Sequence, residues 1–229
     1  MKKILKNTLF IILVIFILTG CTNKNKDESK QSDKINEEIN YIEDNIFNIV
    51  NKYAKGEYLK NNAIDWDSIL KDEKKINDSL DSILMDFSQV NIDKNDLAQF
   101  SNKLDNLLIL TSDKKEIEVI NELSNIYSLL PNFMEKYVDN KSEINKKKLK
   151  ALILSSYVIS NSKSWVDAKV SIQNVENKYA EMMNDVNYIK ENSYNLNKVY
   201  VLIQELKSAI NLENINLVNL KYISLIEKL

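Results

Sequence analysis

Apolar residues recur at alternating spacings of four and three residues, and this periodicity constrains the fold of the chain most strongly. Near the N-terminal end the pattern is formed by Ile35, Ile39, Ile42, Ile46, Ile49 and Tyr53. Such spacing places apolar side chains along one face of a helix, whereas a half-buried strand requires alternation at every second residue. No segment of the sequence shows sustained alternation of that kind between turn signals. The sequence therefore predicts an all-α fold.

Residues that suit helix ends divide the chain into about seven to eight predicted antiparallel helices. The first is expected from Ile35 to about Tyr58. Residues whose side chains can cap a helix N-terminus are expected to start the following ones: Asp65, Asp93, Asp113, Asn140 and Ser164. Pro131 is expected to interrupt the helix that starts at Asp113, because proline lacks an amide N–H. Two further helices are expected near Asn195–Ile210 and Glu213–Leu229.

Residues 35–229 are predicted to form a single all-α domain, either a helical bundle or a short solenoid of α-hairpins. Three segments share the outline of a helix, a short break and a second helix: 104–131, 152–180 and 202–229. Within the second segment, Trp165 and Ala168 resemble the aromatic and alanine positions of tetratricopeptide repeats. Ser156 and Ile159 occupy other consensus positions, so the resemblance covers one hairpin and leaves both architectures open.

The first twenty residues have the features of an export signal. Lys2, Lys3 and Lys6 precede an uninterrupted apolar run from Leu9 to Leu18. A helix needs about twenty apolar residues to cross a hydrocarbon core of about 30 Å, so this run is too short to span a membrane. A basic start followed by a short apolar segment is typical of a secretory signal peptide. Residues 1–20 are therefore predicted to be a signal peptide.

The apolar run ends in Leu18-Thr19-Gly20-Cys21, which resembles the lipobox of bacterial lipoproteins. The resemblance implies cleavage between Gly20 and Cys21 and attachment of acyl chains, such as palmitate, to Cys21. Two acyl chains form a stable anchor where one is marginal. The chain as a whole, rich in Lys, Asn and Ile, resembles helical lipoproteins of low-GC Gram-positive bacteria whose roles are uncharacterised. A lipid-anchored protein on the outer face of the cell membrane is predicted, with an uncleaved N-terminal anchor as the alternative.

Residues 21–34 are predicted to be a lipidated, disordered tether. The segment from Thr22 to Lys34 has no apolar side chain and mixes both signs of charge. A segment of this kind cannot bury enough apolar surface to fold. A flexible chain of its length spans roughly 20 Å.

The composition excludes several kinds of chemistry. The chain has no histidine, which rules out Ser-His-Asp and Cys-His nucleophiles and the HExxH zinc helix. Its two glycines, Gly20 and Gly56, cannot form a glycine-rich phosphate loop. It also has no arginine, and its formal net charge of −2 becomes more negative when the lysine-containing residues 1–20 are removed. An acidic chain without arginine argues against binding to nucleic acid.

The remaining polar motifs indicate structure more than catalysis. Asp65 and Asp67 flank Trp66, and we interpret them as a helix start whose tryptophan packs on the core. Ser160 and Lys163 have the spacing of a Ser-Lys dyad but no accompanying motif, so we interpret the spacing as coincidental. Accordingly, no catalytic residue, cofactor-binding residue or metal ligand is predicted.

Two further groups of side chains are candidates for binding. A run of lysines on one predicted helix is expected to be a solvated face, with an anionic polymer or lipid head group as the alternative partner: Lys146, Lys147, Lys148 and Lys150. Several of the 11 tyrosines fall on the apolar stripes and are expected in the core. On a concave face, tyrosine and asparagine would suit a peptide or glycan.

These observations predict a membrane-anchored, non-enzymatic interaction or structural module of the cell envelope. Its predicted partners are membrane lipid, through acylated Cys21, and an envelope protein. The alternative is a ligand-binding lipoprotein that captures a peptide, glycan or small molecule in a helical groove, and a hydrolase based on carboxylates ranks third. A deep apolar pocket favours ligand capture, whereas a broad concave face favours a protein partner.

Overall fold

The computed structural model describes residues 33–56, 64–89, 92–192 and 195–229. The secondary structure in these ranges is helical, without strands, as predicted. A first helix covers residues 33–56. The others are α2 (Trp66–Gln89), α3 (Lys94–Ser112), α4 (Glu116–Met134), α5 (Lys141–Asn161), α6 (Trp165–Met182), α7 (Val186–Asn192), α8 (Leu196–Asn211) and α9 (Ile215–Ile226). None of the helices in these ranges is long and apolar enough to cross a membrane.

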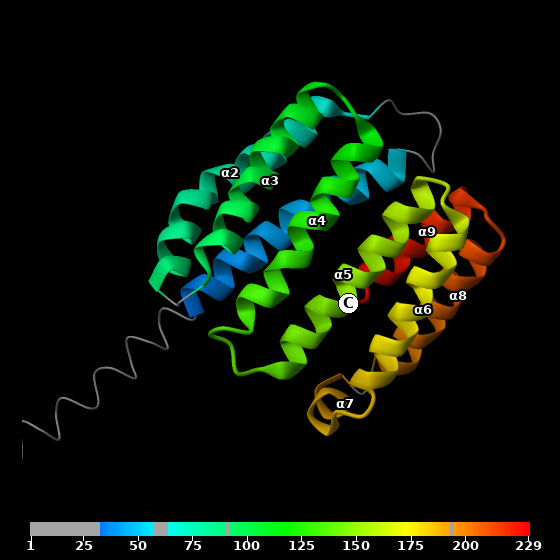
Figure 1. Ribbon diagram of the computed structural model, residues 1–229. Coiled ribbons are helices and arrows are strands. Elements are labelled where there is room, and N and C mark those ends of the chain that lie inside the picture. The colour runs from blue at the N-terminus through cyan, green and yellow to red at the C-terminus, as the bar shows by residue number, and fades with distance from the viewer. Residues whose placement is uncertain (1–32, 57–63, 90–91, 193–194) are drawn as a thin grey trace, which may run out of the picture.

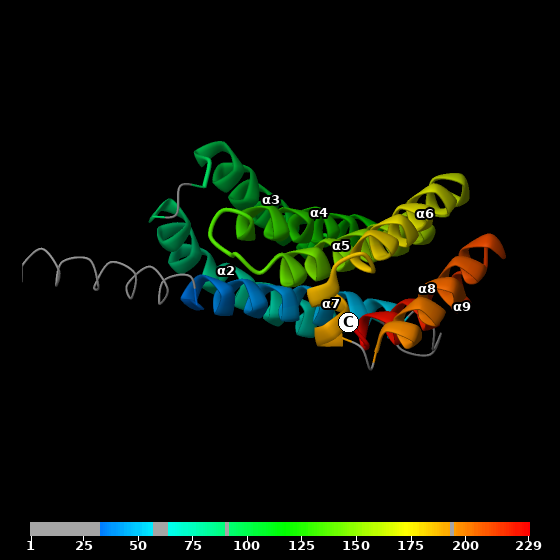
Figure 2. The same ribbon diagram turned by 90° about the horizontal axis from the view of Figure 1, so that it is seen from below.

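The helices pack in two layers. One layer contains α3, α4, α5 and α6 side by side in chain order, and the other contains the first helix, α2, α8 and α9 (Figures 1 and 2). Figure 2 shows that the first layer is curved, with α4 and α5 as its floor and α3 and α6 rising at its edges. The short helix α7 lies at one end, between α6 and α8. The outer surface of the curved layer is therefore concave.

The packing of the last hairpins is that of a bundle. Helix α5 packs against α9, and α6 packs against α8. In a solenoid, each hairpin would stack with its first helix beside the first helix of the next one. Here the α5–α6 hairpin instead faces the α8–α9 hairpin as in an antiparallel four-helix bundle. Of the two predicted architectures, the structure therefore has the helical bundle.

The three segments of similar outline are the hairpins α3–α4, α5–α6 and α8–α9, and they share one turn geometry. Each turn has a residue with positive φ: Lys114 (55°), Lys163 (58°) and Glu213 (53°). The amide of the following residue donates to the carbonyl five residues back, as in Ser164 to Ile159 at 3.3 Å. This is the Schellman ending of a helix, in which glycine normally occupies the left-handed position.

The predicted start of α4 was wrong by a few residues. Asp113 is the C-cap of α3, and α4 begins at Glu116 after the left-handed Lys114. The predicted interruption at Pro131 was also wrong, because α4 continues to Met134. Phe133 packs on Phe87 and Phe100, with ring centroids 5.0 and 5.6 Å apart. Burial of these aromatic rings stabilises the last helical turn although the proline removes one backbone donor.

Most of the other helix starts agree with the sequence, but α9 begins at Ile215, after the left-handed Glu213 near which its start was predicted. Asp93 caps α3 by accepting from the amide of Asn95, and Asn140 caps α5 by accepting from the amide of Glu143. Ser164 occupies the N-cap position of α6. The helix α7 was not predicted, since seven residues are too few to show a helical period.

The apolar stripe of the first helix lies in the core, as its spacing predicts. Its isoleucines, from Ile35 to Ile49, are at most 1% exposed. Polar side chains of the same helix contact three neighbours: Asn48 reaches Asp72 of α2, and Glu43 reaches α4 and α5. The first helix therefore joins the two layers.

Candidate binding groove

The concave layer is hollowed between α4, α5 and α6. Two open hollows, of about 580 and 440 Å³, lie along this surface. Lys148 of α5 and Lys178 of α6 line both of them. We therefore treat the two hollows as one elongated feature and call it the α4–α5–α6 groove.

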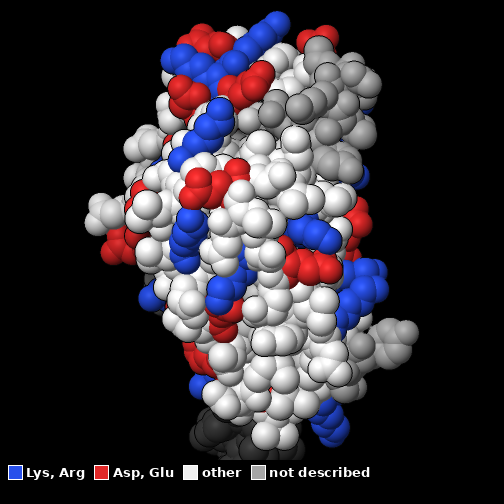
Figure 3. Space-filling model, turned by 90° about the vertical axis from the view of Figure 1, so that its right-hand side faces the viewer, with Lys and Arg blue, Asp and Glu red and all other residues white. Residues whose placement is uncertain are grey.

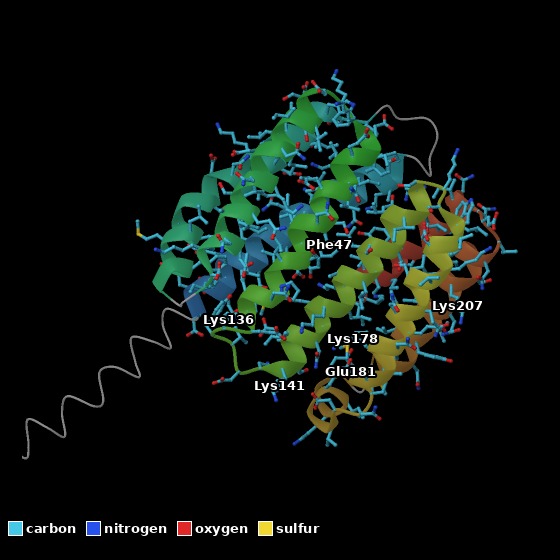
Figure 4. The ribbon with its side chains drawn as sticks, in the orientation of Figure 1. Phe47, Lys136, Lys141, Lys178, Glu181 and Lys207 are labelled. Atoms are coloured by element: carbon cyan, nitrogen blue, oxygen red, sulfur yellow. The ribbon has the colours of Figure 1, made fainter. Side chains whose placement is uncertain are left out.

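One end of the groove is charged. Lys148 Nζ lies 2.5 Å from the Glu135 carboxylate, and Lys178 Nζ lies 3.0 Å from that of Glu181. Lys178 also donates to Asn145 Oδ1 at 2.8 Å, and its side chain is only 13% exposed. Figure 4 shows Lys178 and Glu181 on α6 at the same end of the molecule as the start of α5. Lysines and acids alternate here, so this end suits a partner that carries both signs of charge.

The other end of the groove combines hydroxyl and amide side chains with an apolar floor, and apolar atoms supply most of its surface. The polar residues are Ser124, Asn125, Ser128, Asn132 and Ser155. The floor contains Pro131, Ala151 and Leu152. Serine and asparagine side chains both donate and accept hydrogen bonds, so they can pair with the amides of an extended polypeptide. Recognition in this groove has to come from side chains, because the backbone groups of its walls are used within the helices.

The expected platform of tyrosine and asparagine is only partly present. Asparagine lines the α4–α5–α6 groove, but none of the described tyrosines does. Three tyrosines lie in the core as expected, where the rings of Tyr157 and Tyr222 stack at 4.0 Å and Tyr127 donates to Glu43 at 2.9 Å.

A separate hollow of about 340 Å³ between α6 and α8 does contain tyrosines. Tyr179 and Tyr200 both line it, their ring centroids lie 6.3 Å apart, and Tyr200 is 53% exposed. Figure 3 views the molecule from the side of α6 and α8, where uncharged residues occupy much of the centre. Exposed valines, such as Val166 and Val170 of α6, contribute to the apolar surface of these helices.

The lysine run on α5 is not the solvated face that the sequence predicted. Lys147 and Lys150 point into the protein, where their Nζ atoms lie 2.5 and 2.6 Å from the two carboxylate oxygens of Glu43. Lys147 also donates to Asn40 Oδ1 at 2.7 Å, and Lys150 lies 5.5 Å from the ring centroid of Phe47. These partners lie on the first helix, about a hundred residues earlier, so α5 alone gives no sign of them.

The charges of this cluster shift the acidity of its members. Burial by itself raises the pKa of the Glu43 carboxyl, but Lys150 and Lys147 more than offset it and hold the pKa below the usual value. Burial and the Glu43 charge raise the pKa of Tyr127 well above its usual value. Glu43 is therefore ionised and Tyr127 protonated at neutral pH, so the Tyr127 hydroxyl can donate its hydrogen bond to the Glu43 carboxylate.

The other motifs have structural roles. Asp65 Oδ1 accepts from the amide of Ser68 at 3.0 Å, so it caps α2 as predicted. The buried hydroxyl of Ser160 donates to the carbonyl of Ser156 at 2.7 Å, and Lys163 occupies the left-handed turn. The dyad spacing is therefore accounted for by helix and turn contacts. Within the part of the chain that the structure describes, no group of three or more acids or cysteines could hold a metal ion.

Sequence reasoning missed the buried acids, of which Glu73 has the smallest exposed fraction among the described residues. Glu73 of α2 is fully buried, and neither of its carboxylate oxygens has a hydrogen-bond partner among the described residues. Burial raises its pKa to about 7, with a small opposing effect of the Thr111 hydroxyl. Its position gives the signal that could have revealed it, since it lies four residues after Ile69 and three before Ile76, on the apolar stripe.

The predicted lipid-attachment motif, Leu18-Thr19-Gly20-Cys21, and most of the predicted tether lie outside the described residues. The described residues are helical from residue 33 onward, so the last two residues of the predicted tether, Asp33 and Lys34, are helical. Lys34 forms an ion pair with Asp86 of α2 at 2.8 Å. This contact ties the start of the first helix to the bundle.

Comparisons of this chain with protein families, with curated proteins and with solved structures give no match. Its function therefore has to be inferred from its own residues and their geometry.

Proposed function

We propose that this protein is a lipoprotein held on the outer face of the cell membrane by acylated Cys21. The proposal is supported by the residue types of Leu18-Thr19-Gly20-Cys21, by the basic start and by the apolar run before the cysteine. The polar segment that follows would separate the helical bundle from the bilayer by roughly 20 Å. At that distance the bundle can reach proteins of the cell envelope.

We propose further that the bundle acts as a non-enzymatic interaction module and that the α4–α5–α6 groove receives an extended segment of an envelope protein. One observation carries this choice: two open hollows share Lys148 and Lys178 and so form a single elongated groove on the concave layer. A small apolar ligand is usually enclosed by an apolar pocket, whereas this groove is open and is lined by polar and apolar groups in comparable amounts. A polypeptide supplies the backbone amides and mixed charges that such a lining can pair.

The second candidate function is capture of a peptide, glycan or small molecule in the same groove. The apolar floor favours it, since Pro131, Ala151 and Leu152 lie beneath the hydroxyl and amide side chains. This combination holds an apolar surface and orients the polar groups around it. The two functions differ in the size of the occupant.

Crosslinking in intact cells tests the groove. A photoreactive amino acid is placed at Ser128, an exposed position in the groove, and in a control at Asn102, an exposed position on α3 outside it. The expected result is one or a few protein adducts from position 128 that are absent from position 102. Adducts of low mass from position 128 alone would support ligand capture. Identical products from both positions would refute the groove as the binding site.

Metabolic labelling tests the anchor separately. Cells are grown with a clickable palmitate analogue, and label is expected on the wild-type protein and on neither Cys21→Ala nor Cys21→Ser. Both variants should lose the membrane association that resists high salt. Label that persists in Cys21→Ala would show that the acyl chain is attached at another residue and would refute the proposed anchor at Cys21.

A further inference from the structure

A second cavity, outside the α4–α5–α6 groove, lies between the first helix and α5. Its volume is about 220 Å³. The lining brings together the side chains of Asn40, Glu43, Glu143, Lys146, Lys147 and Lys150. Three lysines therefore line one cavity, and the ammonium groups of two of them, Lys147 and Lys150, are fixed in place by Glu43.

The three ammonium groups retain unused hydrogen-bond donors. Each lysine ammonium has three N–H donors. Lys147 uses two of them, on Asn40 and Glu43, and Lys150 uses one, on Glu43. Lys146 is half-buried and forms no ion pair or hydrogen bond with another described residue. Six of the nine ammonium N–H donors thus have no hydrogen-bond acceptor among the described residues.

The charge of the lining also has a positive excess. Two glutamates, Glu43 and Glu143, face three lysines. The Glu43 carboxylate neutralises one of the two lysines that it binds, and a buried charge without compensation is costly. Burial and the neighbouring Lys150 lower the pKa of Lys146, which is the effect expected where like charges crowd a partly desolvated space. A bound anion would supply the missing negative charge.

We infer that this cavity is a binding site for a small oxyanion of the phosphate class, held by Lys146 together with the unused donors of Lys147 and Lys150. A tetrahedral oxyanion occupies the space of roughly two or three water molecules of about 30 Å³ each, which the cavity accommodates. Lysine serves as a point-charge partner for phosphate. The oxyanion is either free in solution or part of a phospholipid head group. The residues that line this cavity are separate from those of the α4–α5–α6 groove.

Calorimetric titration of the full-length chain with inorganic phosphate tests the site. The protein is kept in a neutral detergent at pH 7, with chloride holding the ionic strength constant. Saturable binding is expected, and Lys146→Gln should weaken it about five- to twentyfold, the effect of one unit charge at close range. Glu143→Gln removes a negative charge from the same lining and should strengthen binding about two- to fivefold. Lys169→Gln, on exposed α6, serves as the control and should change nothing.

The opposite signs of the two variants separate charge from folding. A general disturbance of the fold would weaken binding in both, so a change in the same direction would overturn the inference. Equal binding in wild type and Lys146→Gln, or no saturable binding, would overturn it as well. Nanodiscs identify the source of the oxyanion. Phosphate binding in detergent that disappears in phosphatidylcholine and in phosphatidylglycerol discs indicates a lipid head group, and binding that persists in both indicates a free oxyanion.

Discussion

Lys163 occupies a backbone conformation that glycine suits better, and its replacement is expected to stabilise the bundle. Its φ is 58°, in the left-handed region between α5 and α6. The turn needs this conformation because the amide of Ser164 donates to the carbonyl of Ile159 five residues back. In this region the Cβ of an ordinary residue crowds the following carbonyl oxygen, and glycine has no Cβ.

The expected gain follows from two opposing terms. The left-handed conformation costs an ordinary residue about 1–2 kcal/mol. Glycine reduces this gain by about 0.5–1 kcal/mol, because its backbone loses more conformational entropy when the chain folds. Lys163→Gly should therefore raise the free energy of unfolding by about 0.5–1 kcal/mol, or the Tm by about 1–4 °C for a chain of this size. The gain at Glu213 should be smaller, because that residue also forms an ion pair with Lys169 at 2.7 Å.

Thermal unfolding followed by circular dichroism measures the effect. Two variants serve as controls. Lys163→Ala removes the same side-chain length but keeps the Cβ, so it should give little or no gain. Ser162→Gly places glycine at the neighbouring residue, whose φ is −73°, and should slightly destabilise the protein. A Tm of Lys163→Gly at or below that of wild type, or an equal gain in Lys163→Ala, would refute the reasoning.

Two further predictions concern buried acids. Glu43→Gln leaves the buried ammonium groups of Lys147 and Lys150 without their anion and should lower the free energy of unfolding by about 3–5 kcal/mol, measured by urea denaturation. The exposed pair of Lys169 provides the contrast, since Lys169→Gln should cost no more than about 1 kcal/mol; a similar small loss in both variants would contradict the importance of the buried cluster. Glu73 has a folded-state pKa of about 7 against an ordinary value of 4.5, so the folded state holds the proton more tightly than the unfolded state. Its contribution to stability is therefore full below pH 4.5 and is lost as the pH rises to about 7, by about 3 kcal/mol in total. In Glu73→Gln this loss should be absent, so the stability difference between variant and wild type should grow from pH 5 to pH 8; a difference independent of pH would count against it.

The helices were predictable where a local contact defines them. Asp93 and Asn140 lie at the N-caps where the sequence predicts helices to start, because each side chain accepts from a backbone amide within three residues. The prediction that a helix starts at Asp113 was wrong because aspartate can lie at the end of a helix as well as at its start, and here it ends α3. The prediction that Pro131 interrupts α4 was wrong because the aromatic rings that pack on Phe133 belong to α2 and α3. The sequence of α4 alone does not show these contacts.

The candidate groove and the oxyanion cavity were much less predictable. Lys148 and Lys178 are thirty residues apart and lie in one groove only because α5 and α6 pack side by side. The lysine run of α5 was visible as a run, but which lysines turn inward depends on the position of Glu43 in the first helix. The charge pattern of one helix cannot show whether its lysines face solvent or form buried ion pairs with acids on another helix.

The sequence alone is enough to predict that this chain is helical and which faces of its helices are apolar, because both follow from the spacing of apolar residues and from backbone contacts within a few residues. It also contains the whole basis for proposing a lipid anchor, namely the motif that ends at Cys21. Which polar faces meet depends on the tertiary structure. The bundle places Glu43 against Lys147 and Lys150, and it leaves α4, α5 and α6 as a concave surface. These features arise from pairs of residues far apart in the chain, whose distances are set only when the hairpins pack against one another.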